Sequence, residues 1–377
     1  MARNTIARID PDAVAHNLGR VRQWAAHSRI MAVVKADAYG HRLDLCLPAL
    51  KKADMLAVAT IDEARAIRRL GNRQAVLLLE GVLHGSDLAV VEALGLELTL
   101  HHPSQVAMLE RLGRSPTPRL WLKVESGMHR LGVEPEQVPA LHARLLALPG
   151  IEQVNLVSHF ASAESVDQRS VREQLKRFDA ATQGLGGERC LANSGAILNH
   201  PASHRDWVRA GILLYGISPL EGRAAPELGL KPAMTLEAEI MAINRVPAGE
   251  SIGYGARFTA GRELTVGVVG IGYGDGYPRS VVDGTPILVR GRRCPLVGRV
   301  SMDMLTIDLS ACPEAAIGDR AVLWGQDLPI EEIAAAAATI PYELTCRITR
   351  RVRYRSITAG GAAEGPEPAG IRAGALE

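Results

Sequence analysis

Reactive polar side chains follow several apolar, strand-like runs of this 377-residue sequence. The first such run, in "MAVVKADAYGH", ends at Lys35. Taken singly, a lysine at a strand end is usually a solvated surface group, and a single histidine is usually a hydrogen-bonded structural residue. Later runs end near five more polar side chains, namely Lys123, Arg130, His159, Ser194 and Arg209. This recurrence points to chemistry only if the fold brings the ends of these runs together.

The first two thirds of the chain alternate between strand-like and helix-like patterns. Amphipathic helical patterns such as 62–71 and 168–186 separate the apolar runs and end at glycine, as helices commonly do. Roughly eight strand-like runs predict an α/β fold of the (β/α)₈ barrel type, with a usual size of about 250 residues. A doubly wound open sheet is the alternative on pattern alone. In such a barrel the active site lies where the strands end, so the polar side chains would share one rim.

The sequence after about Pro232 has a different pattern. Short strand-like runs punctuated by glycine and proline, such as "RELTVGVVGIGYGDGY", predict a mostly β C-terminal domain. Within it, "PIEEIAAAAATI" indicates one late helix. We therefore expect a barrel domain over 1–230 and a β-rich domain over 231–357. The first residues of the chain can pair with the second domain instead of the barrel. The Gly/Ala/Pro-rich tail, 358–377, is expected to be disordered.

Composition and charge exclude several classes of protein. The formal net charge is +2, so no strong attraction to nucleic acid or to an anionic membrane is expected. The five cysteines are scattered and form no C-x-x-C pair, which argues against a disulfide framework and against a structural zinc site. The N-terminus has no apolar signal-like segment, and no apolar run is long enough to span a membrane. We expect a cytoplasmic protein without a metal.

The seventh and eighth strand-like runs indicate a phosphate site. Barrels frequently bind phosphate there through backbone N–H groups, a hydroxyl and a short helix N-terminus. "NSGA", followed by the helical run "AILNH", supplies the hydroxyl of Ser194, and "RAGILLYG" supplies Gly211, where backbone can approach closely. Together with Lys35 on the first strand, a phosphate at this point suggests pyridoxal 5′-phosphate. The phosphate would anchor the cofactor and the lysine would form a Schiff base with its aldehyde.

"VVKADAYGH" resembles the cofactor-lysine motif of the alanine racemases, which carry pyridoxal phosphate on a barrel. Further matches follow in order, among them "WLKVESGMHRLG", "SHFASA", "NSGA", "RAGILLYG", "GYGARF", "GYGDGYPR", "VGRVSMDML" and "PYELTC". They extend from about residue 5 to about residue 355 and so cover nearly the whole chain. The resemblance implies an enzyme that interconverts L- and D-alanine, either to supply D-alanine for peptidoglycan or to catabolise alanine.

The resemblance also implies two bases on opposite faces of the substrate. Lys35 would bind the cofactor covalently and act as the base on one face, and Tyr254 would be the base on the other. Two bases are needed because one base cannot easily reach both faces of the same carbon. Arg209 would face the pyridine nitrogen, with His159 hydrogen-bonded behind it. The phosphate would be held by Tyr39, Ser194, Gly211, Ile212 and Tyr342.

The remaining matches imply a substrate site shared between two subunits. Arg130 would lie near the phenolic oxygen of the cofactor and contact the substrate, steadied by Lys123, which is often carbamylated in relatives. Tyr273 and Met302 would shape the entrance, the Met302 backbone would contact the substrate carboxylate, and Asp303 would support that loop. In the family a head-to-tail homodimer completes each site with three residues of the partner subunit, which correspond to Tyr254, Tyr273 and Met302.

Three alternatives stay open. A broad-spectrum or serine racemase of the same family would carry the same residues, although such relatives tend to be exported. A non-catalytic pyridoxal-phosphate-binding protein would need only the barrel and the lysine, whereas this chain also has Tyr254 and a second domain. A decarboxylase of the same two-domain build would need a catalytic cysteine and an acidic pocket, and neither is identified. The chain departs from the family pattern at Arg42, Ala210 and Gly274, and also in "RRVRYR", where "RVPR" is frequent.

Overall fold

The computed structural model describes residues 4–357, and within them the chain forms two compact units. The barrel unit consists of residues 13–232 and 340–346, and the β unit consists of residues 4–12, 233–339 and 347–357. The tail expected to be disordered, 358–377, lies outside the described residues.

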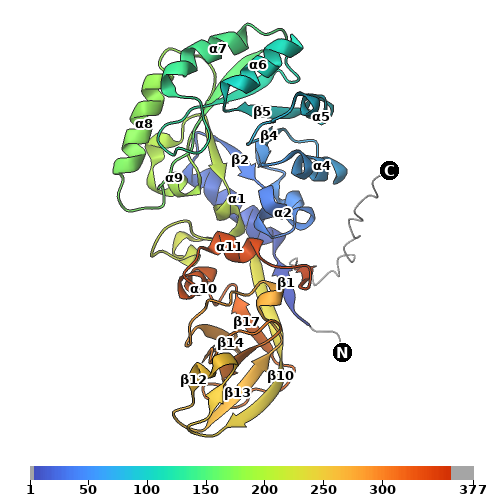
Figure 1. Ribbon diagram of the computed structural model, residues 1–377, viewed down its shortest axis with the longest axis vertical. Coiled ribbons are helices and arrows are strands. Elements are labelled where there is room, and N and C mark those ends of the chain that lie inside the picture. Colours follow the sequence, from blue (N-terminus) through green and yellow to red (C-terminus); the bar gives the residue numbers. More distant parts are fainter. Residues whose placement is uncertain (1–3, 358–377) are drawn as a thin grey trace. The chain divides into compact units, whose positions relative to one another are not determined.

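Eight parallel strands of the barrel unit close into a barrel (Figure 1). The strands are β2 (Arg29–Val33), β3 (Met55–Val58), β4 (Val76–Leu78), β5 (Leu96–Leu100), β6 (Arg119–Lys123), β7 (Gln153–Val157), β8 (Arg189–Cys190) and β9 (Trp207–Ala210). β9 closes the ring by pairing in parallel with β2, where Ile30 lies opposite Val208. Most residues of these strands are buried, as expected when helices cover a parallel sheet. The prediction of a (β/α)₈ barrel is confirmed, and the open sheet is excluded.

The interior of the barrel is a packed core. Met31, Trp121 and Trp207 belong to one cluster of buried side chains. The two tryptophans meet edge to face with ring centroids 6.0 Å apart. Their indole N–H groups donate to Glu97 and Glu188 at 2.6 and 2.7 Å, so these buried polar groups are paired. The filled interior leaves the strand ends as the place for a functional site.

Helices follow most of the barrel strands and surround them (Figure 1). They are α1 (Pro11–Trp24), α3 (Leu43–Cys46), α4 (Ile61–Arg69), α5 (Leu88–Ala93), α6 (Pro103–Leu112), α7 (Val138–Leu146), α8 (Arg169–Ala181) and α9 (Ser194–Asn199). α4 begins with a capping box, because Glu63 N–H donates to the Thr60 hydroxyl at 3.3 Å and Thr60 N–H donates to the Glu63 carboxylate at 3.1 Å. The cap fixes the direction in which α4 leaves β3.

β10 (Met234–Val246) is the central strand of the β unit. It pairs in antiparallel fashion with β1 (Ile6–Ile9), β13 (Leu264–Val269) and β17 (Arg320–Trp324). β1 also pairs in parallel with β18 (Arg353–Ser356). The other strands are β11 (Ser251–Ile252), β12 (Phe258–Thr259), β14 (Pro286–Val289), β15 (Arg292–Pro295) and β16 (Leu305–Asp308). The prediction of a mostly β C-terminal part is confirmed.

Two helices occur late in the chain, where the sequence pattern indicated one. α10 (Ile330–Ala336) is the expected helix. α11 (Pro341–Cys346) is additional, and it belongs to the barrel unit although it lies late in the chain. The prediction of a helix in this segment is confirmed by α10, whereas the sequence pattern gave no indication of the six-residue α11.

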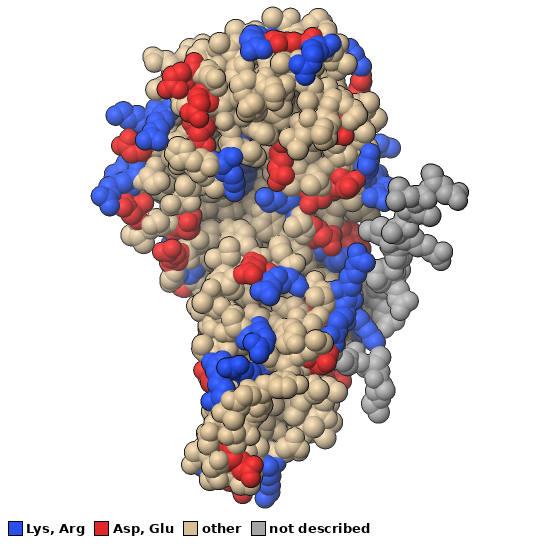
Figure 2. All heavy atoms as spheres, in the orientation of Figure 1, with Lys and Arg blue, Asp and Glu red and all other residues tan. Residues whose placement is uncertain are grey.

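Charged side chains of both signs are interspersed over the face shown in Figure 2. Ion pairs among the described residues include Arg144 with Glu110 and Arg293 with Glu332. Within residues 4–357, no helix combines the length and the hydropathy of a membrane span. The same residues contain no group of three or more His, Cys, Asp or Glu side chains arranged to hold a metal ion.

Candidate active site

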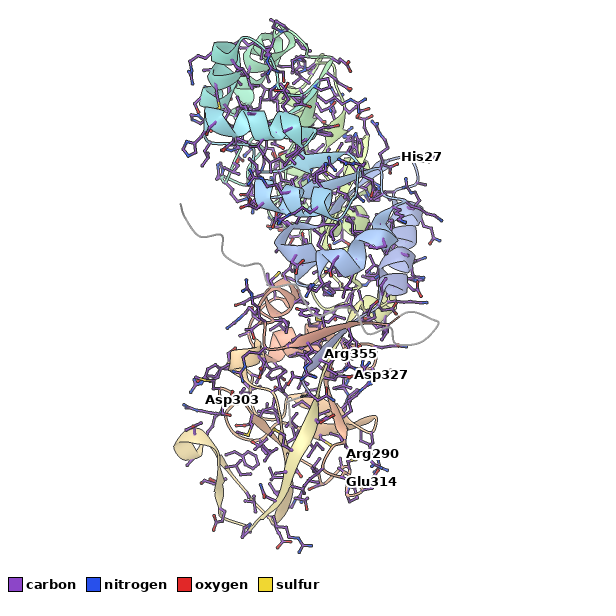
Figure 3. All side chains as sticks on the ribbon, turned by 90° about the vertical axis from the view of Figure 1, so that its right-hand side faces the viewer. His27, Arg290, Asp303, Glu314, Asp327 and Arg355 are labelled. Carbon is purple, nitrogen blue, oxygen red and sulfur yellow. The ribbon has the colours of Figure 1, made fainter. Side chains whose placement is uncertain are left out.

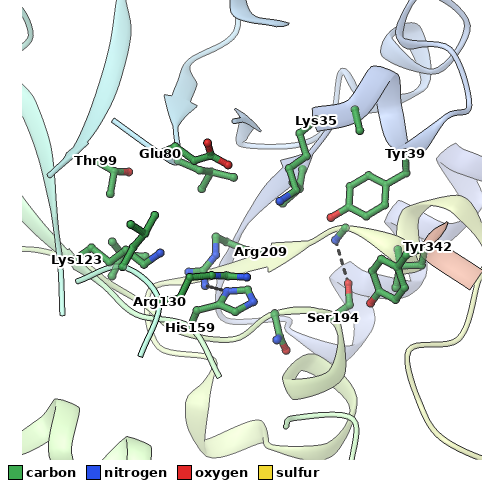
Figure 4. Close-up of a pocket in the computed structure, with 18 of the residues that line it drawn as sticks. Lys35, Tyr39, Glu80, Thr99, Lys123, Arg130, His159, Ser194, Arg209 and Tyr342 are labelled. Carbon is green, nitrogen blue, oxygen red and sulfur yellow. Dashed lines mark hydrogen bonds between the residues drawn. The ribbon is translucent and has the colours of Figure 1, made fainter. Parts of the chain in front are cut away.

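A pocket of about 440 Å³ lies at the ends of the barrel strands, and its walls come from the barrel unit (Figure 4). This volume is within the usual range of small-molecule sites. Ten residues singled out in the sequence line it, namely Lys35, Tyr39, Lys123, Arg130, His159, Ser194, Arg209, Gly211, Ile212 and Tyr342. They are dispersed along the chain, and the closed barrel is what brings them together.

Lys35 follows β2 and begins an unusual turn, labelled α2 (Lys35–Tyr39). Four consecutive non-glycine residues of this turn have left-handed backbone, with φ of 52° at Ala36, 53° at Asp37, 57° at Ala38 and 53° at Tyr39. Left-handed backbone costs an L-residue about 1 kcal/mol or more, and such strain concentrates at functional sites. The turn presents both Lys35 and Tyr39 to the pocket.

Two further rings, those of Tyr215 and His41, form a stack with the ring of Tyr39. Its ring lies 5.1 Å from the ring of Tyr215, which in turn lies 4.6 Å from the ring of His41. The Tyr215 hydroxyl donates to the carbonyl oxygen of Val33 at 3.0 Å. Burial lowers the pKa of His41 to about 4, so its imidazole is neutral. Nδ1 of His41 lies 2.9 Å from the carbonyl oxygen of Tyr39 and can donate to it.

One corner of the pocket collects hydroxyl groups. Ser194, the first residue of α9, accepts a hydrogen bond from Gly211 N–H at 3.0 Å. A Cβ at residue 211 would lie 2.5 Å from the Tyr39 hydroxyl, so any larger residue there would force the Tyr39 ring to shift. Burial raises the pKa of both Tyr39 and Tyr342, so their hydroxyls stay protonated and can donate. Such a group of donors suits an anion.

Arg209 is buried, and carbonyl groups from neighbouring strand ends fix its guanidinium. Nη1 donates to the Cys190 carbonyl oxygen at 3.0 Å, and Nη2 donates to that of Ser158 at 2.6 Å. Nη2 also lies 3.0 Å from Nδ1 of His159. Burial and the cationic Arg209 lower the pKa of His159, so its imidazole is neutral and Nδ1 accepts this bond. Arg209 Nε–H has no hydrogen-bond partner among residues 4–357.

The pocket carries an excess of positive charge. Burial, followed by the nearby cations Arg209 and Arg130, lowers the pKa of Lys123 to about 8. In the described part of the chain, no carboxylate forms an ion pair with Lys35, Lys123 or Arg130. A negatively charged ligand would compensate these groups.

Arg130 lies on a loop that an acidic side chain organises. The Glu125 carboxylate accepts hydrogen bonds of 2.5–2.9 Å from the backbone N–H groups of residues 127–129. These bonds lower the pKa of Glu125 although its partial burial acts to raise it. Glu125 therefore stays ionised and fixes the path of the chain towards Arg130.

Ten further residues that line the pocket were not singled out in the sequence, and five of them carry a heteroatom in the side chain: Glu80, Thr99, Ser158, Asn193 and Cys346. Glu80 follows β4 and Thr99 lies near the end of β5. A search for polar residues at the end of every predicted strand would therefore have found both. The Thr99 hydroxyl is buried and has no hydrogen-bond partner among residues 4–357. Cys346 ends α11, the helix that the pattern did not indicate.

Four further candidates belong to the β unit: Tyr254, Tyr273, Met302 and Asp303. Tyr254 is 70% exposed in the single chain and Met302 is 52% exposed. The segments that carry Tyr273 and Met302 are joined by two backbone hydrogen bonds of 3.0 and 2.9 Å. Asp303, labelled in Figure 3, forms an ion pair with Arg351. The structure thus groups the last three of these residues, while Tyr254 lies in a separate short turn of the unit.

Three of the departures from the family pattern are single residues, and the structure places each of them. Arg42 forms an ion pair with Asp44 at 3.0 Å and does not line the pocket. Ala210 is buried in β9. A Cβ at residue 274 would overlap Nη1 of Arg351, so the alanine common in relatives would require Arg351 to move.

Comparisons with known proteins agree along the chain. The model of the alanine racemase N-terminal domain matches residues 9–219, and that of the C-terminal domain matches residues 233–356. An alanine racemase of Nitrosospira multiformis is 46% identical over 354 residues, which are 94% of this chain and 99% of the relative. The crystal structure of a biosynthetic alanine racemase from Pseudomonas aeruginosa is 44% identical, with a TM-score of 0.91, and covers 94% of this chain and 100% of that one. An alanine racemase from a D-cycloserine-producing Streptomyces lavendulae is 33% identical, with a TM-score of 0.86, over 95% of this chain and 98% of that one.

Proposed function

The chain belongs to the alanine racemase family, and from this premise we propose that it racemises alanine with Lys35 and Tyr254 as its two bases and pyridoxal 5′-phosphate as its cofactor. The observation that carries the proposal is the convergence of Lys35, Arg209 and the hydroxyl of Ser194 on one pocket. The pocket's cations have no ion-paired carboxylate among the described residues, which favours a ligand that carries a phosphate.

The residues of the pocket fit this cofactor. The hydroxyls of Tyr39, Ser194 and Tyr342 would hold the phosphate together with the backbone at Gly211 and Ile212. Arg209 would donate its unpartnered Nε–H to the pyridine nitrogen, and arginine can only donate, so that nitrogen would have to accept. His159 would support Arg209, and Arg130 would donate to the phenolic oxygen. When bound, the cofactor would withdraw electrons from the substrate Cα and so weaken its bond to hydrogen.

Racemisation requires one proton to leave a face of the substrate Cα and another to arrive on the opposite face. Lys35 Nζ would move the proton on one face, and Tyr254 Oη would move the proton on the other. The direction of the reaction decides which of the two groups accepts and which donates. Each general acid–base step of this kind typically contributes about 10²–10⁴-fold to the rate.

We extend the proposal to a head-to-tail homodimer. Tyr254 and Met302 are exposed in the single chain, whereas a catalytic base is expected to work in a site that excludes water. A second copy of the chain would shelter them and receive Tyr254, Tyr273 and Met302 into its barrel pocket. The Met302 backbone would bind the substrate carboxylate, and Asp303 would hold that loop through Arg351. A cytoplasmic location, and the choice between D-alanine supply and alanine breakdown, stay predictions.

Tyr254→Phe tests the two-base assignment because it removes Oη and keeps the ring. The variant should slow the loss of α-deuterium to solvent far more from one alanine enantiomer than from the other, by about 10²-fold or more. Equal slowing from both enantiomers would contradict the assignment. Conversion of L-alanine, L-serine and L-lysine, with and without added pyridoxal phosphate, separates an alanine racemase from a broad-spectrum enzyme and from a non-catalytic binding protein.

A further inference from the structure

Glu63 connects two neighbouring strand-to-helix segments of the barrel through one carboxylate. Oε1 accepts a hydrogen bond of 2.7 Å from Ala36 N–H, the first backbone donor after Lys35. Oε2 accepts bonds of 2.8 and 3.1 Å from the N–H groups of Ala59 and Thr60 at the start of α4. The second set of bonds is an ordinary helix cap. The bond to Ala36 is not needed for a cap.

The turn that follows Lys35 needs support from outside itself. Its own backbone bonds include Gly40 N–H to the Ala36 carbonyl at 2.8 Å and Arg42 N–H to the Asp37 carbonyl at 3.0 Å. At its far end the Asp37 side chain accepts from Leu43 N–H at 2.8 Å. The Ala36 N–H, at its beginning, donates to Glu63. Strained backbone persists only where the surrounding structure over-determines it, and at the entry to this turn that support comes from Glu63.

We propose that Glu63 is a positioning residue that holds the first peptide of the left-handed turn and thereby orients the Lys35 amine. The peptide between Lys35 and Ala36 sets the direction of the Lys35 side chain, so an anchored Ala36 N–H limits where Nζ can lie. A bond to an ionised carboxylate is stronger than one between neutral groups, which suits a strained element. The inference rests on the proposed role of Lys35 and deepens it.

Glu63→Ala and Glu63→Gln test the proposal, with Thr60→Ala as the matched control. Thr60→Ala removes the hydroxyl that accepts a hydrogen bond from Glu63 N–H, so it weakens the same cap. It leaves the hydrogen bond from Ala36 N–H to the Glu63 carboxylate in place. Hydrogen exchange at the Ala36 amide should accelerate in Glu63→Ala and not in Thr60→Ala. Covalent attachment of pyridoxal phosphate to Lys35, followed by visible absorbance, should slow by about tenfold or more in Glu63→Ala, because small misplacements of a reacting group are costly. In the full enzyme kcat should fall more than KM rises.

Glu63→Gln keeps one acceptor oxygen and should give intermediate values, and it decides the matter if Glu63→Ala does not fold. If both Glu63 variants match Thr60→Ala in attachment rate and in kcat, Glu63 is only a helix cap and the proposal is wrong. The two proposals fail differently. If Lys35 is not the cofactor lysine, pyridoxal phosphate will not attach to it in the unmodified enzyme, whereas faster exchange of the Ala36 amide in Glu63→Ala would still report the anchor.

Discussion

At the scale of single residues, His41 has a buried imidazole that stacks on Tyr215 and is neutral in the folded protein. Its pKa falls from 6.5 to about 4, first because burial penalises the charged form. Between these pH values the unfolded chain binds a proton that the folded chain does not. The free energy of unfolding therefore falls as the pH drops from about 6.5 towards 4, and this loss is attributable to one side chain.

His41→Phe should remove this loss while keeping a ring against Tyr215. Between about pH 7 and pH 5, the wild type should lose roughly 2 kcal/mol more in free energy of unfolding than the variant. Urea titrations at the two pH values measure this difference. His27→Phe, at an exposed position labelled in Figure 3, is the control and should behave as the wild type. An unchanged pH dependence in His41→Phe would contradict the assignment.

Lys123 is the second residue with a predicted pH response. Burial and nearby arginines lower its pKa to about 8, so the neutral amine becomes the main form as the pH rises through this value. The neutral amine can attack CO₂ to form a carbamate with release of one proton. We therefore predict that carbamate formed at a fixed concentration of dissolved ¹³CO₂ increases from about pH 7 to pH 9.

The carbon resonance of the carbamate measures this reaction. Lys123→Met should abolish the signal, and Lys176→Met, which changes an exposed lysine of α8, should leave it intact. A signal that survives in Lys123→Met would show that another amine reacts.

At the scale of elements, the turn after Lys35 and helix α11 are packed with no space for a side chain between them. Gly40 has φ of +77°, and a Cβ there would overlap the carbonyl oxygen of Thr345. Gly40→Ala should therefore displace α11, which carries Tyr342, and weaken the proposed phosphate site. We expect it to be about 1–3 kcal/mol less stable than Gly71→Ala. Gly71 is a matched control because it has φ of +76° and nothing within 4 Å of a Cβ.

Thermal unfolding and the dissociation constant of pyridoxal phosphate check this prediction together. The constant should rise in Gly40→Ala and stay near the wild-type value in Gly71→Ala. If the two variants bind equally well, contact with α11 does not shape the site.

The sequence was most informative where elements are buried and regular. Each barrel strand is a short apolar run, so the count of roughly eight strands was predicted, and the location of barrel sites at strand ends then gathered Lys35, His159, Ser194 and Arg209. The left-handed turn could not be predicted, because "ADAY" has no glycine and the turn depends on Glu63, which lies 27 residues from Ala36. α11 was missed because six residues carry no visible period. The local sequence pattern therefore predicts strands, whose burial shows in neighbouring residues. It does not predict a backbone conformation that depends on contacts with distant residues.

At the scale of the whole molecule, the proposed dimer makes a prediction about mixtures of inactive chains. If each site takes Lys35 from one subunit and Tyr254 from the other, a hybrid of Lys35→Ala and Tyr254→Phe chains contains one intact site. Refolding the two variants together in equal amounts should restore about a quarter of the wild-type activity. Each variant refolded alone is the control. If the mixture recovers nothing while hybrid dimers form, both bases must come from one chain.

Because β1 pairs with β10 and β18, the sheet of the β unit can form only late in synthesis. β1 leaves the ribosome first, but its partner β10 follows about 220 residues later, which at ~5–20 residues per second is roughly ten seconds or more. Throughout that interval β1 is a strand without a sheet, while the barrel strands between them can pair as they emerge. α11, which completes the pocket with Tyr342, is made later still. A nascent chain should therefore capture its cofactor only near the end of translation, so early termination would release barrels that cannot retain it.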